Sequence, residues 1–328
     1  MLAVTSLGFD PTAMLLGLSV RLETLALAAI VLFVLVLVAI RAGRAGQVPG
    51  GDSARRRGSG RLRRDDLLLI AFGAVPGAIV GGRIGYGLVH WDYYSANQAA
   101  LVDPAGGGLS LTLAVALGTL CAIAVARLLA APVDRWLGLA RGPVLLALGL
   151  GKLATMLGGA GQGKFSGSVW ATAYTGTGPW ESLNADQAAL PSQAIEGLLV
   201  LAGLVLLVVV VPSLLRFRVK VTSQAIDIGF RGGVHAPGGA TGFALGLVFW
   251  AVARFIAAFT WRDAHVLGPL NAEQLVLIGF VLAIVAIVTI AATVRRRRRT
   301  RAAVAKGTAP AIEAGKTAGA VSTQVVQG

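Results

Sequence analysis

The sequence has few charged residues, one cysteine and three histidines, and each shortage excludes a class of protein. Charged residues occupy 13% of the 328 positions, whereas a soluble domain would be about a quarter charged. The single cysteine, Cys121, excludes an intrachain disulfide framework. His90, His235 and His265 fall in or beside the connections between apolar runs, so we expect no metal site. No nucleotide-binding or Ser/His/Asp motif stands out, and no cofactor is expected.

Long apolar runs dominate what is present. Hydrophobic residues make up 55% of the chain, and runs of Leu, Val and Ala lack the alternation of a membrane barrel. The pattern predicts an all-α integral membrane protein, a bundle of seven transmembrane helices, because only helices or closed barrels satisfy the backbone in lipid. The expected spans are 14–40, 67–90, 107–130, 142–160, 192–213, 240–260 and 272–294.

Basic residues predict the orientation of these spans. The first connection, which begins at Arg41, carries eight arginines, and the tail opens with the run Arg295 to Arg299. The alternate connections are poor in basic residues; the one after His90 has none up to Pro104. By the positive-inside rule, the N-terminus lies outside and the C-terminus is cytoplasmic. The net charge of +14 is thereby assigned to cytoplasmic loops, and we expect no nucleic-acid partner.

The apolar runs and the basic residues together divide the chain into three parts. Residues 1–13 form an extracytoplasmic N-terminus, and 14–294 form the membrane domain. That domain includes a flexible cytoplasmic loop, 41–66, and an outer loop, 161–190, which is expected to form a small extracytoplasmic cap. Residues 295–328 are predicted to be a disordered basic cytoplasmic tail. The absence of an internal sequence repeat argues against a transporter or channel.

Charged residues inside apolar spans are costly and point to function. The four cations there outnumber the two acids, which predicts an anionic guest such as a lipid phosphate. Structural ion pairs are the alternative, for example Arg83 with Glu23 or Glu196. In the fifth span, helical spacing places Ser192, Gln193 and Glu196 on one polar face, which alternatively serves helix packing alone. The four cations are Arg21, Arg83, Lys152 and Arg254, and the acids are Glu23 and Glu196.

Several stretches, in this order, resemble the prolipoprotein diacylglyceryl transferases. GGRIGYGLVHW from Gly81 is similar to the family's GGR-[IL]-GY segment, and GGGLSLTLAVALG from Gly106 to its DGGMSFHGG signature. LGLGKLATMLGG from Leu148 resembles GxGRxGNFINGE, and LPSQAIEG from Leu190 resembles HPSQLYE. Arg254 stands where the family carries the arginine of its FRxxxE segment. The likeness covers roughly residues 15–294.

The sequence also departs from these motifs. Thr112 replaces the family's histidine, Lys152 its fourth-span arginine, and Ala258 its sixth-span glutamate. Glu23 stands at the position of a first-span tyrosine, and Leu190 replaces the histidine before PSQ. The phosphate-facing cations are therefore largely kept, while the hydrogen-bonding and proton-transfer groups are largely replaced.

The resemblance implies transfer of a diacylglyceryl group from phosphatidylglycerol to the lipobox cysteine of prolipoproteins. The implied setting is the bacterial cytoplasmic membrane, and a multi-pass monomer is expected. Glu196 or Glu23 would be the base, and the substrate contacts would be Lys152, Arg254, Arg83, Gln193 and Tyr86. The alternative is a catalytically impaired paralogue that binds anionic phospholipid or lipoprotein partners.

Overall fold

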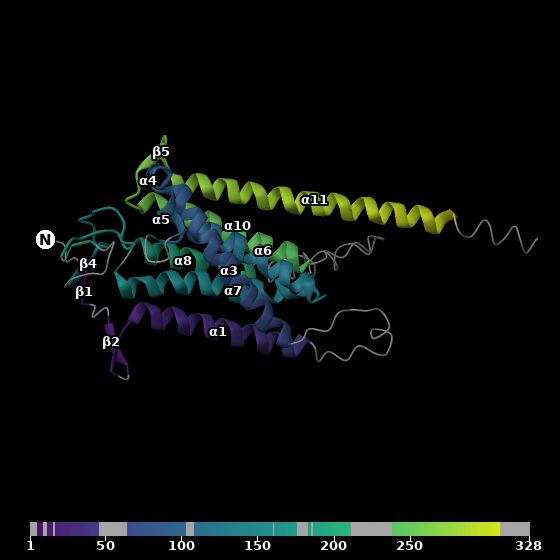
Figure 1. The fold of residues 1–328 in the computed structure, drawn as a ribbon, viewed down its shortest axis with the longest axis horizontal. Helices are drawn as coiled ribbons and strands as arrows, with labels where there is room; N and C mark the ends of the chain where they lie inside the picture. The colour runs from purple at the N-terminus through teal and green to yellow at the C-terminus, as the bar shows by residue number, and fades with distance from the viewer. Residues whose placement is uncertain are drawn as a thin grey trace, which may run out of the picture. The chain divides into compact units, whose positions relative to one another are not determined.

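The computed structural model of the chain (Figure 1) describes most of the helical segments and several short strands. It comprises two compact units, residues 1–281 and 282–328, and all features of the site below belong to the first. The described residues are 5–8, 12–15, 17–45, 64–102, 108–159, 161–175, 183–184, 186–210 and 238–308.

Helices account for nearly all of the regular structure. In the described residues, six are long and apolar enough to cross a membrane, which makes the chain a multi-pass, mostly helical membrane protein. The predicted fifth span is a shorter apolar helix, Ser192–Val208, and the rest of that span after Val210 lies outside the described residues. The helices are α1 (Leu22–Ala45), α3 (Arg64–Val89), α4 (Trp91–Ala96), α5 (Gln98–Val102), α6 (Leu111–Leu128), α7 (Val133–Thr155), α8 (Ser192–Val205), α10 (Gly239–Ala257) and α11 (Ala272–Thr308).

Three pairs of short strands accompany the helices. Strand β1 (Thr5–Gly8) pairs in parallel with β4 (Thr172–Thr175), far along the chain. The antiparallel pairs are β2 (Thr12–Leu15) with β3 (Leu18–Arg21), and β5 (His265–Leu267) with β6 (Leu270–Asn271). The strands lie before α1, in the 161–190 segment, and between α10 and α11.

Three predicted boundaries are wrong. The span expected at 14–40 begins instead at Leu22, because the preceding residues form the β2–β3 hairpin. Its turn contains Gly17 at φ 83°, a conformation that glycine adopts without steric cost. Helix α7 begins at Val133 rather than 142, so it includes charged residues that had been assigned to a connection. Helix α11 continues to Thr308, although disorder was expected from residue 295.

Helices α1, α7, α8 and α10 lie side by side in the first unit (Figure 1). The start of α10 is fixed by Asp134 of α7, whose carboxylate accepts hydrogen bonds from the backbone N–H groups of Gly239 (3.1 Å) and Ala240 (2.9 Å). Such N-terminal capping satisfies amides that lack partners within the helix. Helices α7 and α10, which carry two of the predicted site cations, are thereby held together at one end.

A glycine at every fourth position lets α3 approach α6 closely. A Cβ atom added at Gly77 would lie 2.5 Å from the Cys121 Sγ and 2.8 Å from the carbonyl oxygen of Leu117. One added at Gly81 would lie 2.8 Å from the Leu117 Cβ. Small residues at this spacing are typical of tight helix pairs in membranes. The four glycines of this stripe are Gly73, Gly77, Gly81 and Gly85.

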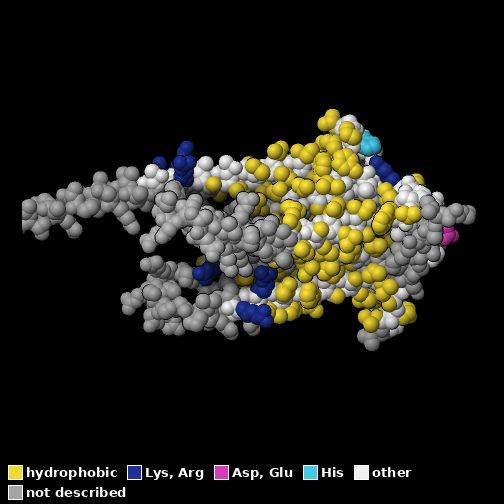
Figure 2. Space-filling model, turned by 180° about the vertical axis from the view of Figure 1, so that it is seen from behind, with side chains coloured by type: hydrophobic (Ala, Val, Ile, Leu, Met, Phe, Trp, Pro, Cys, Tyr) yellow, Lys and Arg dark blue, Asp and Glu magenta, His cyan; other side chains and the backbone are white. Residues whose placement is uncertain are grey.

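The outward-facing surface of the helices is apolar. Figure 2 shows hydrophobic side chains covering a broad belt on the face in view, and α1 and α3 expose large residues such as Phe33 (55%) and Phe72 (81%). Side chains of this kind face lipid hydrocarbon in a membrane protein. The polar side chains Gln193, Glu196 and Arg254, in contrast, are buried within the first unit.

The segment expected to form a cap folds back on itself through backbone pairing. Thr172 and Ala189 exchange hydrogen bonds of 2.9 and 3.1 Å, and the N–H of Gly163 donates to Leu190 (2.8 Å). The hydroxyl of Tyr174 donates to the carbonyl of Met156 (3.0 Å), which ties the segment to the end of α7, and burial raises the pKa of this phenol to about 12. The segment is therefore ordered where it is described, while its extracytoplasmic location stays a prediction.

We expect Gly81→Ala to lower the stability of the protein in detergent by about 1–3 kcal/mol, the usual cost of overpacking. The added methyl group meets backbone and side-chain atoms of α6 that cannot move independently. The control is Gly279→Ala in α11, because a Cβ there meets nothing within 4 Å. Its melting temperature should stay the same or rise, and equal melting of the two variants would contradict the close approach of α3 and α6.

The predicted orientation is testable with single cysteines placed at exposed described positions. In a Cys121→Ala background, Gly167→Cys should react with a membrane-impermeant maleimide in intact cells. Arg44→Cys, in the last turn of α1, should react only after permeabilisation, because basic residues beside a membrane span are retained in the cytoplasm. Labelling of both in intact cells would overturn the topology.

Candidate functional site

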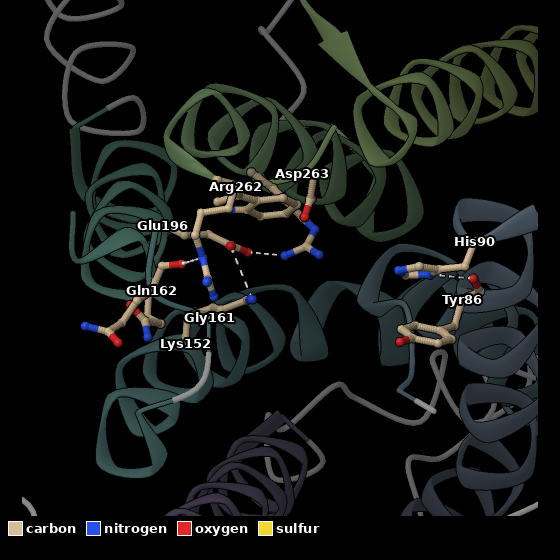
Figure 3. Close-up of a pocket in the computed structure, with 11 residues that line it drawn as sticks. Tyr86, His90, Lys152, Gly161, Gln162, Glu196, Arg262 and Asp263 are labelled. Carbon is tan, nitrogen blue, oxygen red and sulfur yellow. Dashed lines mark hydrogen bonds and ion pairs between the residues drawn. The ribbon is translucent and has the colours of Figure 1, made fainter. Parts of the chain in front are cut away.

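A cavity of about 400 Å³ lies between the C-terminal end of α3 and the helices α7, α8 and α10 (Figure 3). It contains five of the seven site residues predicted from the sequence: Tyr86, Lys152, Gln193, Glu196 and Arg254. Six further residues line it: His90, Gly161, Gln162, Trp261, Arg262 and Asp263. The cavity therefore combines side chains from four helices with two connecting segments.

Local sequence brings the polar side chains to this level of the bundle. Lys152 lies in the last turn of α7, and α8 begins directly after Pro191. Ser192, Gln193 and Glu196 fill the first turns of α8, and all three are at most 3% exposed. Their common face, predicted from the i, i+3 and i+4 spacing, is buried in the bundle as expected.

Glu196 joins two of the cations that line the cavity, Lys152 and Arg254. One carboxylate oxygen lies 2.6 Å from Nη1 of Arg254, and the other lies 3.3 Å from Nζ of Lys152. The side chains of Glu196 and Arg254 are 1% and 7% exposed, whereas that of Lys152 is 23% exposed. Both oxygens of the Glu196 carboxylate are therefore engaged by cations.

Arg254 also pairs with Glu273, a buried acid that the sequence analysis missed. Its Nε and Nη2 atoms lie 3.2 and 3.1 Å from one oxygen of Glu273. The same carboxylate accepts hydrogen bonds from the hydroxyls of Thr112 (2.5 Å) and Ser110 (3.2 Å) on the α6 side. Glu273 thus provides, from the next helix, a carboxylate partner for Arg254, where the resemblance placed a glutamate at position 258.

A capping box positions Glu273. The side chain of Asn271 accepts a hydrogen bond from the N–H of Gln274, and the side chain of Gln274 accepts one from the N–H of Asn271, both at 2.9 Å. This reciprocal pattern starts α11 and places Glu273 in its first turn, where the helix dipole favours a negative charge. The stretch NAEQ was the signal for this helix start, and the acid within it should have been counted with the buried ones.

Trp261 covers the cationic pair. The centroid of its indole ring lies 4.6 Å from Cζ of Arg254 and 5.8 Å from Nζ of Lys152. Both distances are within the range of cation–π attraction. Trp261 begins the connection between α10 and α11, so this connection helps to fix the guanidinium on one face.

The excess of buried cations over buried acids is smaller than the sequence predicted. Around the cavity, Lys152, Arg254 and Arg262 face the carboxylates of Glu196 and Asp263, and Glu273 lies behind Arg254. The expectation that only Glu23 and Glu196 are buried acids is therefore wrong. The charge available to an anionic guest comes chiefly from the more accessible cations of the cavity rather than from Arg254.

Arg83 and Glu23 are not among the residues that line this cavity. Arg83 donates to the backbone carbonyls of Leu101 (3.0 Å), Gly108 (3.3 Å) and Ala100 (3.5 Å). It therefore supports the short helix α5 and the chain that leads to α6, instead of the proposed ion pair with Glu196. Glu23 lies in the first turn of α1 and pairs with Arg21 at 3.3 Å. The sequence pattern identified both as buried charges but could not show which wall of the bundle they occupy.

Tyr86 and His90 form the opposite wall of the cavity. Their ring centroids are 4.2 Å apart, and Nδ1 of His90 lies 3.0 Å from the carbonyl oxygen of Tyr86. Asp263 lies at the rim, where partial burial and the nearby carboxylate of Glu273 raise its pKa. In the described part of the chain, no group of three His, Cys, Asp or Glu side chains could hold a metal ion. The arrangement instead combines three cations on one side of the cavity with an imidazole and a phenol on the other.

The buried ion pairs of Arg254 predict that Glu273→Ala lowers the stability of the protein strongly. Glu273→Ala leaves Arg254 with a single carboxylate partner and Thr112 without its acceptor, and breaking a buried pair costs about 3–5 kcal/mol. The matched control is Glu23→Ala, since its pair with Arg21 is half exposed and is worth about 1 kcal/mol or less. Thermal unfolding in detergent measures both, and similar losses would show that the network is not buried.

Comparison with known proteins agrees with this architecture. The family model of the prolipoprotein diacylglyceryl transferases matches residues 11–290. A phosphatidylglycerol–prolipoprotein diacylglyceryl transferase of Finegoldia magna is 42% identical over 50 residues, which are 15% of this chain and 20% of that relative. The chain thus matches a fifth of the length of this relative. Because the family match covers most of the 328 residues, the protein belongs to the prolipoprotein diacylglyceryl transferase family, a family of membrane transferases of lipoprotein biosynthesis.

Proposed function

We propose that the protein transfers the diacylglyceryl group of phosphatidylglycerol to the lipobox cysteine of prolipoproteins, in the bacterial cytoplasmic membrane. The observation that carries the proposal is the pair of cations, Lys152 and Arg254, held by one buried carboxylate beside a cavity within the membrane domain. A lipid phosphate is the abundant anion that reaches such a site from a bilayer. We expect a monomer to be active.

Lys152 is the cation best placed to receive the phosphate. Its side chain is more accessible than that of Arg254, and it makes one ion pair, with Glu196, where Arg254 makes two. A phosphate oxygen that approaches the cavity can therefore share the ammonium group of Lys152. Arg254 has further N–H groups besides those bonded to carboxylates, and Trp261 keeps its plane fixed. Gln193, which also lines the cavity, is in position to bind the headgroup.

The reaction forms one bond and breaks another. The sulfur of the lipobox cysteine attacks the glycerol carbon that bears the phosphate, a C–S bond forms, and the C–O bond to the phosphate breaks. Glycerol phosphate leaves with the electron pair of that bond, so negative charge grows on the phosphate oxygen in the transition state. Cations fixed in a water-poor site stabilise such charge without reorganisation.

Glu196 has a positioning role in this mechanism. The sequence analysis suggested Glu196 or Glu23 as the base, but Glu196 is engaged by both cations and Glu23 is not among the cavity residues. Glu196 sets the separation of Lys152 and Arg254 and keeps both side chains directed at the cavity. Glu23 belongs to the support of α1, where it pairs with Arg21.

Lys152→Met should reduce transfer by about 10²–10³-fold, the usual loss when one group that stabilises a transition-state charge is removed. Purified protein is mixed with phosphatidylglycerol and a lipobox peptide, and the mass gain of the peptide is followed. The matched control is Lys164→Met, an exposed lysine of the 161–190 segment that is not among the cavity residues. Undiminished transfer by Lys152→Met would contradict the phosphate role.

Arg254→Leu is a less informative variant, because it leaves Glu196 and Glu273 without their shared cation and should destabilise the fold. The wild type itself tests the function most directly. A wild type that retains phosphatidylglycerol but transfers nothing, and that does not restore lipoprotein lipidation in cells depleted of their own transferase, would overturn the proposed activity.

A further inference from the structure

We propose that His90 is the base that takes the proton from the attacking cysteine thiol. The inference rests on the proposed transfer reaction and adds the proton acceptor which that reaction requires. Two observations support the inference. His90 lies on the cavity wall, and the two buried carboxylates, Glu196 and Glu273, are both engaged by cations.

The local structure fixes the ring of His90 in one orientation. His90 follows the last residue of α3, and its own carbonyl accepts hydrogen bonds from the N–H groups of Tyr93 (3.1 Å) and Tyr94 (3.2 Å) in α4. The imidazole lies against the ring of Tyr86. In Figure 3 its outer edge points away from α3 and toward the side of the cavity where Arg262 and Asp263 lie.

The hydrogen bond at Nδ1 selects the tautomer. The partner of Nδ1 is the backbone carbonyl of Tyr86, which can only accept a hydrogen bond, so Nδ1 carries the proton. In the neutral ring, Nε2 then has the free lone pair. The lone pair is on the edge of the ring that faces the cavity, and His90 is exposed, so an incoming peptide thiol can reach it.

The other polar side chains of the cavity are less suited to accept this proton. Glu196 is stabilised as an anion by two cations, and Lys152 and Arg254 carry protons already. Asp263 lies within electrostatic reach of His90, which favours the charged form of its carboxylate. Its carboxylate can stabilise the imidazolium that forms, as an acid does beside the histidine of a catalytic triad. Imidazole is also the side chain that changes charge between pH 5 and 8, where a general base is most effective.

The proton balance closes with the groups present. The S–H proton moves to Nε2 of His90 as the sulfur attacks, and the imidazolium then loses it to the released glycerol phosphate or to water. No oxidant, metal or further reactant is needed. The charged and titratable groups that surround His90 from neighbouring elements are Tyr86 of α3, Asp92, Tyr93 and Tyr94 of α4, Arg262 and Asp263 of the α10–α11 connection, and Lys152, Glu196 and Arg254 across the cavity.

The test compares His90→Gln with His265→Gln, which changes an exposed histidine of β5. Glutamine can keep the hydrogen bond to the Tyr86 carbonyl but cannot take up a proton. We expect His90→Gln to lower kcat by about 10²–10⁴-fold, the usual range for a lost general base. Its KM for phosphatidylglycerol and its melting temperature should stay near those of the wild type, and His265→Gln should behave as the wild type throughout.

The pH profile separates a base from a structural side chain. Wild-type kcat should fall as the pH is lowered through the range in which an imidazole is protonated, since only the neutral ring accepts the thiol proton. The residual activity of His90→Gln should instead rise with pH toward the ionisation of a free thiol near pH 8.5.

Equal kcat values and profiles in an active wild type and His90→Gln would overturn this inference alone. An inactive wild type would overturn the proposed function and the inference with it. If His90→Gln does not fold, a wild-type kcat that does not fall as the pH is lowered would overturn the inference.

Discussion

The ion pairs of Arg254 are the interaction on which the rest of the site depends. A guanidinium inside a membrane bundle is costly unless acids and backbone groups surround it. Here Glu196 of α8 and Glu273 of α11 approach it within 2.6 and 3.1 Å. These contacts join α8, α10 and the start of α11, and hydroxyls beside α6 extend the network through Glu273. Lys152 makes one ion pair, with Glu196, and its side chain is more accessible than that of Arg254.

Two residues that the family motifs lead one to expect are absent from this chain. The resemblance located a histidine at position 112 and a glutamate at position 258, and this sequence has Thr112 and Ala258 instead. In the structure, Glu273 accepts a hydrogen bond from Thr112 and pairs with Arg254. The buried charge balance is therefore maintained by an acid from a different helix. The proposed base, His90, similarly reaches the cavity from a different segment.

Two local structural features, a glycine stripe and a helix capping box, make these long-range contacts possible. The glycine stripe of α3 allows α6 to approach closely, because no Cβ separates the two backbones. The capping box of Asn271 and Gln274 starts α11 at a defined residue and points Glu273 at Arg254. Arg83, the cation beside the stripe, donates to neighbouring carbonyls and is not among the cavity residues. Charged side chains in this protein thus join neighbouring segments as well as line the cavity.

The sequence by itself determined that this is a helical membrane protein, because runs of apolar residues long enough to cross a bilayer leave few alternatives. It also predicted the polar face of α8 and the importance of Lys152, Glu196 and Arg254, since charges are rare in such runs. Only the tertiary structure decided the partners of these charges. Which acid meets which cation depends on helix packing between distant segments, so the pairing of Glu273 with Arg254 and the place of His90 on the cavity wall came from the tertiary structure.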